Sequence, residues 1–321
     1  MDCTKAPGID DQLEFHLATA DDFEGVMAIS GDIYRGMDYL PAKYHIWLQE
    51  TNRRTFVARR KGQVVALDSV CLVDEGSTAV SEGLRVAPWE RGRGITRLML
   101  DHVEDFLKTE FPAVKVIRLT RMQDPPSSML YKYRLLHSKA VLSLMFKAEE
   151  VKEKVQVLIS RMEKEGQCFQ PPMTLGAQDV MRVCTNQTVI EKLLPAKMLI
   201  QNWLPVYPLK LNLDYLLTKG VTWMADNSEE PNMLSLGNPA VRVPLKGSFH
   251  RADIDLFGFD PRNVKIHFLS QLLSISKEIH DGGLVCFLIM EKAVFPTMDA
   301  FCKDINRFVL LTEQLVLEKD I

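Results

Sequence analysis

Apolar and polar residues alternate with two different periods along the first half of the chain. Leu13, Phe15 and Leu17 alternate with polar neighbours, and three longer β-rich runs farther on are separated by short polar turns. A period of two is typical of half-buried strands, and tight polar turns favour antiparallel pairing. The pattern predicts, in chain order, a strand at 13–17, helices at about 21–30 and 42–50, and an antiparallel meander of strands at 54–60, 64–73 and 78–88.

A glycine-bearing turn follows the third strand of this meander, where residues 91–94 read RGRG. The next residues have the spacing of one apolar helix face, formed by Ile95, Leu98, Met99, Val103, Phe106 and Leu107. The first N–H groups of such a helix have no intrahelical partners and point along the positive end of its dipole. The sequence therefore predicts an anion site, most simply for a phosphate.

The remaining pattern predicts a second half built in a similar order. In the first half, a strand at 114–121, a short helix at 129–136 and a strand at 140–146 complete one unit. A charged amphipathic helix at 149–165 and a proline-containing stretch then form a linker. The second half reads as strands at 180–184, 221–225, 233–237, 251–258, 283–290 and 308–317, with helices at 188–195, 211–220, 264–280 and 297–305.

This order predicts an α/β (α+β) fold with a central mixed sheet, followed by a second, degenerate copy. The corresponding strand–helix junction of the second copy reads GFDPRNV and has no pair of closely spaced glycines. We therefore expect a tail at 1–12, a catalytic domain at 13–148, a linker at 149–170 and a C-terminal domain without a cofactor motif at 171–321.

Composition excludes several other classes of protein. The 321 residues are 46% hydrophobic with a net charge of −3, which favours a well-packed core and argues against a strongly basic nucleic-acid binder. The longest apolar runs are too short to span a bilayer, and the N-terminus lacks the apolar segment of a secretory signal. Six scattered cysteines without metal-type spacing predict a reduced, cytoplasmic protein with no metal site.

Residues 13–147 resemble the GNAT superfamily of acetyl-CoA-dependent N-acetyltransferases. The family signature Q/R-x-x-G-x-G/A corresponds to Arg91–Thr96, with threonine as the last small residue, and the family's leucine–tyrosine pair corresponds to Leu130 and Tyr131. Leu135 and Leu136 stand where a glycine–phenylalanine pair is usual. The runs GLRVAPWERGRGITRLM and DIYRGMDYLP resemble, more narrowly, the vertebrate histidine N-acetyltransferases and the fish enzymes in particular.

The resemblance implies acetyl-CoA as co-substrate and acetylation of the α-amine of free L-histidine. It places the cofactor-binding residues at Leu84, Arg85, Val86, Arg91, Gly92, Arg93, Gly94, Ile95, Thr96 and Arg97. Leu84 and Val86 would pair with the pantetheine amides, and the N–H groups of the glycine turn would hold the pyrophosphate. Arg93 and Arg97 either reach a phosphate or remain solvated.

Candidate catalytic residues follow from the chemistry of acyl transfer. Tyr131 can protonate the leaving thiolate, and Glu82 can take a proton from the amine, with Asp68 as the alternative base. The first helix–helix loop supplies the expected substrate residues Tyr34, Arg35, Asp38 and Tyr39. There, Asp38 would hold an imidazolium, and Arg35 or Arg85 would hold a carboxylate.

Two other functions remain open at this point. The first is acetylation of a protein lysine or N-terminus, which would require an open groove that a second domain would tend to close. The second is binding of acyl-CoA without catalysis, against which the leucine–tyrosine pair argues.

Overall fold

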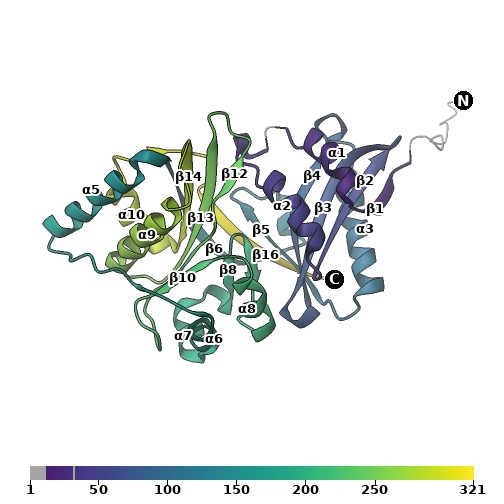
Figure 1. Ribbon diagram of the computed structural model, residues 1–321. Helices are drawn as coiled ribbons and strands as arrows, with labels where there is room; N and C mark the ends of the chain where they lie inside the picture. Colours follow the sequence, from purple (N-terminus) through teal and green to yellow (C-terminus); the bar gives the residue numbers. More distant parts are fainter. Residues whose placement is uncertain (1–11, 32) are drawn as a thin grey trace, which may run out of the picture. The chain divides into compact units, whose positions relative to one another are not determined.

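The computed structural model describes residues 12–31 and 33–321 (Figure 1). The chain forms two compact units: the first consists of Met1–Arg118 with Asp320–Ile321, and the second of Leu119–Lys319. This division by contacts falls within one strand, whereas the sequence places a linker at 149–170. That domain boundary therefore stays a prediction, and each unit is described by itself.

The first unit is a sheet in the order β1-β2-β3-β4-β5, in which the first four strands are antiparallel neighbours. The predicted meander is confirmed, and its turns lie at the polar positions that the sequence marked. The elements are β1 (Glu14–Leu17), α1 (Phe23–Ala28), α2 (Leu40–Gln49), β2 (Arg53–Arg60), β3 (Gln63–Val73), β4 (Thr78–Val86), α3 (Ile95–Glu110) and β5 (Val116–Met122).

Helices α2 and α3 cover opposite faces of this sheet (Figure 1). On β2, the Phe56 ring lies 4.9 Å from that of Phe106 in α3, whereas the Arg53 guanidinium lies 4.3 Å from the Trp47 ring in α2. Because side chains alternate between the two faces along a strand, residues 53 and 56, which are three positions apart, point to opposite sides of the sheet. The α3 face is mainly apolar, while the α2 face carries buried charged residues.

The second unit is a sheet in the order β16-β6-β14-β13-β11-β10-β7. Its apolar core joins α5, α9 and α10 to one face of β6, β13 and β14. The strands are β6 (Arg134–Lys147), β7 (Met173–Thr174), β8 (Leu199–Gln201), β9 (Leu204–Val206), β10 (Thr222–Ala225), β11 (Leu234–Gly237), β12 (Val241–Val243), β13 (Phe249–Phe257), β14 (Gly283–Met290), β15 (Asn306–Arg307) and β16 (Glu313–Asp320). The helices are α4 (Ser127–Leu130), α5 (Val151–Lys164), α6 (Ala177–Thr185), α7 (Gln187–Leu193), α8 (Lys210–Leu217), α9 (Pro261–Ser276) and α10 (Phe295–Phe301).

The strand predicted at 180–184 is wrong, because these residues lie in the helix α6. Val180, Val183 and Cys184 are its buried residues, at the i, i+3, i+4 spacing of a helix. The Asp179 carboxylate accepts a hydrogen bond from the Gly176 amide at 3.2 Å and so caps the first turn. A second correction concerns α4, which ends at Leu130, so that the following strand β6 starts at Arg134 rather than at 140.

The second unit contains a strand–helix–strand segment, β13–α9–β14, without a glycine turn. Its two strands pair in parallel from Phe249 opposite Gly283 to Asp255 opposite Ile289. At the start of α9, the Asp260 carboxylate accepts hydrogen bonds from the amides of Arg262 and Asn263, each at 3.3 Å. The helix N-terminus, where a phosphate could otherwise bind, therefore carries the chain's own carboxylate.

Candidate active site

A β-bulge interrupts the pairing of β3 with β4. Leu67 lies opposite Arg85 and Ser69 lies opposite Glu82, so Asp68 alone faces the two residues Gly83 and Leu84. Gly83 has a φ of 79°, a left-handed conformation that glycine adopts without strain. The bulge takes the backbone of Gly83 and Leu84 out of register with β3.

The glycine turn has the backbone geometry that the sequence predicts. Gly92 and Gly94 have φ values of 78° and 80°, and a Cβ added at either position would meet no atom within 4 Å. Gly94 is the N-cap of α3, whose first N–H groups lack intrahelical acceptors. The side chain of Ile95 is buried in the core, so only its backbone is left for a ligand. Open space around these amides fits a phosphate group.

Neighbouring side chains hold this turn in place. The buried Glu90 pairs with Arg60 at 2.7 Å, and the Ala87 amide donates to the Val65 carbonyl at 2.8 Å. Three of the four arginines predicted for the cofactor site are exposed. Arg91 Nε donates to the Val86 carbonyl at 3.3 Å, Arg93 lies 3.5 Å from Glu90, and Arg97 lies 3.4 Å from Asp101. Because the guanidinium groups of Arg93 and Arg97 are exposed, these contacts are weak and leave both arginines able to turn toward an anion.

The loop before α2 brings the predicted substrate residues together. Tyr34 and Arg35 adopt φ values of 51° and 54°, which are strained for residues other than glycine. The rings of Tyr34 and Tyr39 stack at 6.2 Å. Burial raises the pKa of Tyr39, whose phenol also interacts electrostatically with Tyr34, Arg85, Glu82 and Asp38. Tyr34, Asp38 and Tyr39 therefore form one cluster with Arg85 on the α2 face of the sheet.

Asp38 and Arg85 form a buried ion pair. Asp38 Oδ1 accepts from Arg85 Nη2 and, at 3.0 Å, from the Leu40 amide, while Arg85 Nη1 donates to the Gly83 carbonyl at 2.6 Å. The sequence predicted that Asp38 and Arg85 meet different ends of a substrate, yet they neutralise each other. Two polar atoms, Asp38 Oδ2 and Arg85 Nε, remain buried without a hydrogen-bond partner among the residues described here.

The two candidate bases lie on opposite faces of the sheet. Glu82 accepts from Arg53 Nη2 at 2.6 Å on the α2 face, next to the cluster around Tyr39. Asp68 is fully buried, and burial raises its pKa to about 7, while a 3.2 Å hydrogen bond from Ser81 acts in the opposite direction. Asp68 pairs in register with Phe56 and so faces α3. Glu82 is therefore the base candidate that shares a face with the substrate loop.

Arg53 and Trp47 are missed by the sequence reasoning. Arg53 Nε donates to Glu50 at 2.7 Å, and the Arg53 guanidinium lies on the Trp47 ring. A buried arginine between two carboxylates leaves no local pattern in the sequence. The only signal is the adjacent pair of arginines at the start of a strand, which is usually solvated.

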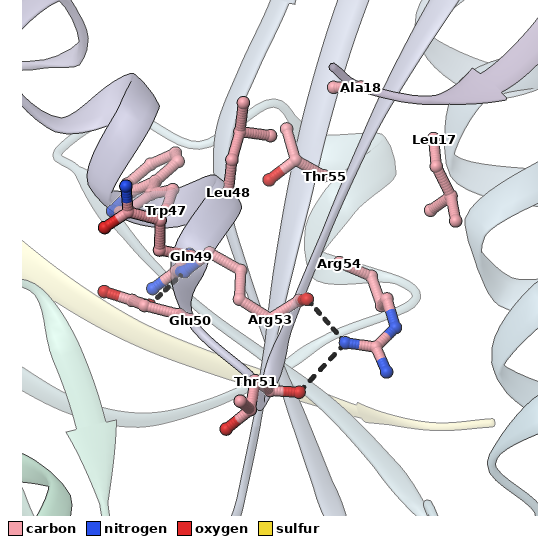
Figure 2. A pocket seen from close by; sticks show the side chains of 10 residues that line it. All are labelled: Leu17, Ala18, Trp47, Leu48, Gln49, Glu50, Thr51, Arg53, Arg54 and Thr55. Carbon is pink, nitrogen blue, oxygen red and sulfur yellow. Dashed lines mark hydrogen bonds and ion pairs between the residues drawn. The ribbon is translucent and has the colours of Figure 1, made fainter. Parts of the chain in front are cut away.

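A pocket of about 520 Å³ opens beside this arginine (Figure 2). It lies between the end of β1, the C-terminal end of α2 and the start of β2. Arg54 lines it as well and donates to the carbonyls of Thr51 and Arg53. The lining residues are Leu17, Ala18, Trp47, Leu48, Gln49, Glu50, Thr51, Arg53, Arg54 and Thr55.

Tyr131 belongs to the second unit and follows the single turn of α4. Its amide donates to the Ser127 carbonyl at 3.3 Å, and the residue is 90% exposed. The phenol is thus accessible to a ligand, and its role as proton donor stays a prediction.

Two features are absent from the part of the chain that the structure describes. Within residues 12–31 and 33–321, no helix combines the length and apolar character needed to cross a membrane. The same residues contain no cluster of three or more histidine, cysteine, aspartate or glutamate side chains suited to a metal ion.

Comparison with known proteins identifies the class of this fold. Residues 23–134 match the family described as Acetyltransferase (GNAT) family. A solved tandem GNAT protein from the clavulanic acid biosynthesis pathway superposes with a TM-score of 0.54 at 14% identity, covering 96% of this chain and 98% of that chain. The predicted fold, a GNAT domain followed by a degenerate second copy, is thereby confirmed.

Relatives of known sequence narrow the class further. Residues 168–291 match the family described as Histidine N-acetyltransferase, C-terminal. Histidine N-acetyltransferase of Scomber australasicus is 36% identical over 317 residues, covering 96% of this chain and 94% of the relative. The protein of the same name from Oreochromis niloticus is 35% identical over 321 residues, with the same coverage. The chain belongs to the histidine N-acetyltransferase family and is an acetyl-CoA-dependent N-acetyltransferase.

Proposed function

We propose that this enzyme transfers the acetyl group of acetyl-CoA to the α-amine of free L-histidine, giving N-α-acetylhistidine. The names of its relatives support histidine as the substrate. The structural observation that carries the proposal is the pair of buried atoms left without partners, the acceptor Asp38 Oδ2 and the donor Arg85 Nε. Histidine offers a matching donor, its imidazole N–H, and a matching acceptor, its carboxylate.

Acetyl-CoA would bind along β4 and at the start of α3. Backbone groups of Leu84 and Val86 would pair with its pantetheine arm. The amides of Gly92, Arg93, Gly94, Ile95 and Thr96 would surround the pyrophosphate. The side chains of Arg91, Arg93 and Arg97 are then available to phosphate oxygens as charge-assisted donors.

The acyl transfer would proceed by direct attack of the amine on the thioester. Glu82 takes a proton from the substrate ammonium, and the freed nitrogen forms a bond to the carbonyl carbon. A backbone N–H near Leu84 donates to the oxygen as negative charge develops on it. The C–S bond then breaks, and Tyr131 gives its phenolic proton to the departing thiolate. The nitrogen loses its second proton to the tyrosinate, which restores the phenol and leaves the neutral amide.

The substrate would be held at its side chain and its carboxylate by one ion pair. Arg85 orients Asp38 through one nitrogen and leaves another for the substrate carboxylate. Tyr34, Arg35 and Tyr39 enclose the imidazole. An analogue that lacks one of these groups leaves a buried polar atom unpaired, which costs about 1–3 kcal/mol.

A direct competition assay tests this proposal. Labelled acetyl-CoA is offered with histidine, the other free amino acids, histamine and a lysine peptide in one mixture. We expect histidine to be acetylated preferentially and histamine, which has no carboxylate, to be roughly 100-fold less efficient by kcat/KM. Equal acetylation of histamine or of the lysine peptide would contradict the proposal and favour a protein acetyltransferase.

A matched pair of variants locates the preference at Asp38. Asp38→Asn keeps the shape of the side chain but removes its charge, and we expect it to relax the preference for imidazole. Asp74→Asn is the control, because Asp74 forms an equally buried ion pair with Arg118 at 2.9 Å in the same unit. Both variants should lose stability, but only Asp38→Asn should change the order of substrates.

A further inference from the structure

We propose that Arg53 is a positioning residue for acetyl transfer, which fixes the Glu82 carboxylate at the acyl site. The inference rests on the proposed role of Glu82 as the base. Arg53 itself touches no reacting atom in this scheme. It acts through the carboxylate that it holds.

Four contacts fix the Arg53 side chain, which is only 3% exposed. Its Nε donates to Glu50 at 2.7 Å, its Nη2 to Glu82 at 2.6 Å and its Nη1 to the Ser69 hydroxyl at 3.3 Å. The guanidinium also lies 4.3 Å from the centroid of the Trp47 ring. Three directional bonds and one stacking contact leave the planar guanidinium a single orientation.

Trp47, which stacks on Arg53, also packs against the bulge of β4. A Cβ added at Gly83 would come within 3.0 Å of the Trp47 ring, so this ring packs directly against the bulged backbone. Trp47 lies in the last turn of α2, and Glu50 is the residue that follows this helix. One short stretch of chain thus sets both the acyl-site backbone and, through Arg53, the neighbouring carboxylate.

Fixing the carboxylate has a kinetic consequence. A base must lie within hydrogen-bond reach of the ammonium proton in the bound substrate. A displacement of about 1 Å in a reacting group can reduce a rate by about 100-fold. Arg53 also supplies the positive charge between the partly buried carboxylates of Glu50 and Glu82, which would otherwise repel each other.

The test is a double-mutant cycle on the full-length enzyme, using Arg53→Lys, Glu82→Gln and the double variant. Arg53→Lys keeps the positive charge but lacks the planar guanidinium, whose N–H groups bond to Glu50 and Glu82 at the same time. We therefore expect the kcat for histidine to fall roughly tenfold or more, with the Kd for acetyl-CoA unchanged. In the Glu82→Gln background the same change should have little further effect on kcat. Calorimetric titration with acetyl-CoA and thermal melting provide readouts that do not depend on turnover.

The matched control is Arg54→Ala. Arg54 lines the same pocket (Figure 2) but bonds to the backbone carbonyls of Thr51 and Arg53 rather than to Glu82. We expect its kcat to stay within about twofold of the wild-type value, as for a surface change away from the site.

The pocket also allows a rescue experiment. Arg53→Ala opens space toward the pocket of about 520 Å³ that Arg53 lines (Figure 2). Millimolar methylguanidinium should then restore part of the lost kcat in Arg53→Ala and have no effect on Glu82→Gln. A merely structural role would predict recovery of thermal stability without recovery of kcat.

The outcomes separate this inference from the proposed function. If the wild-type enzyme does not acetylate histidine, or if Glu82→Gln keeps full kcat, the proposed function or its base is wrong, and the inference is overturned with it. If Glu82→Gln is impaired but Arg53→Lys keeps full kcat, only the inference is overturned. The same holds if Arg53→Lys reduces kcat equally in both backgrounds. Where Arg53→Ala does not fold, the Arg53→Lys cycle decides.

Discussion

Replacing Gly94 by aspartate tests the proposed acetyl-CoA site most directly. The fold should tolerate the change, because an added Cβ meets no atom within 4 Å, and the left-handed φ of 80° costs a non-glycine residue about 1–2 kcal/mol. The new carboxylate would lie at the N-terminus of α3, next to the proposed pyrophosphate. Two unit charges 4 Å apart repel by about 1 kcal/mol in water and about 4 kcal/mol near a protein surface.

An intermediate repulsion of about 2 kcal/mol corresponds to roughly a 30-fold rise in the Kd for acetyl-CoA. Gly94→Asn is the matched control, since asparagine has nearly the same shape and tolerates the left-handed region, but adds no charge. The Kd of each variant for acetyl-CoA is measured by isothermal titration at low and at high salt. Screening at high salt should reduce the difference between the two Kd values. Equal, wild-type affinity in both folded variants would refute the placement of the pyrophosphate at this turn.

Two further predictions concern Tyr131 and Asp68. Tyr131→Phe should lower kcat roughly 10- to 1000-fold with the acetyl-CoA affinity unchanged, and near-normal turnover across the pH range would assign the phenol to packing alone. Asp68 has its pKa raised to about 7 by burial, so the folded state binds this proton more tightly than the unfolded chain does. Its contribution to stability is then complete below about pH 4 and is lost as the pH rises to about 7. Asp68→Asn should therefore melt higher than the wild type at pH 8 and equally at pH 4. A difference in melting temperature that does not change with pH, as expected for the exposed control Asp101→Asn, would disprove the assignment.

Local features of this protein could be predicted from its sequence. Gly92 and Gly94 are followed by an amphipathic run, and the structure gives both a positive φ at the start of α3. The meander could be predicted because alternation and turn residues are both short-range signals. These features need only a few neighbouring residues, and the same residues carry the resemblance to the family.

Short apolar runs were harder to assign. The run VMRVC contains three buried residues whose spacing fits one turn of helix, but a strand of five residues has the same composition. What decides between them is the capping carboxylate of Asp179 and the packing of α6 against α8, with which it makes contacts. Such packing depends on residues far along the chain.

Pairings in the candidate site could not be predicted at all. Arg53 and Glu82 are 29 positions apart, and Asp38 and Arg85 are 47 positions apart. The sequence named Glu82, Asp38 and Arg85 as chemically suitable groups, but it assigned each to the substrate. It could not show that Arg85 holds Asp38, because that pair joins a loop to a strand, or that Arg53 holds Glu82, because that pair depends on the register of three strands.

The bulge at Gly83 explains why these pairs share one face. In a regular strand, side chains three positions apart point to opposite sides, so Glu82 and Arg85 would be separated by the sheet. The register shift adds one residue between them and returns Arg85 to the side of Glu82. Arg85 can then reach both Asp38 and the Tyr39 ring, whose centroid lies 5.6 Å from the guanidinium. The bulge at this single glycine thus turns Arg85 toward the substrate loop, on the same side of the sheet as Glu82.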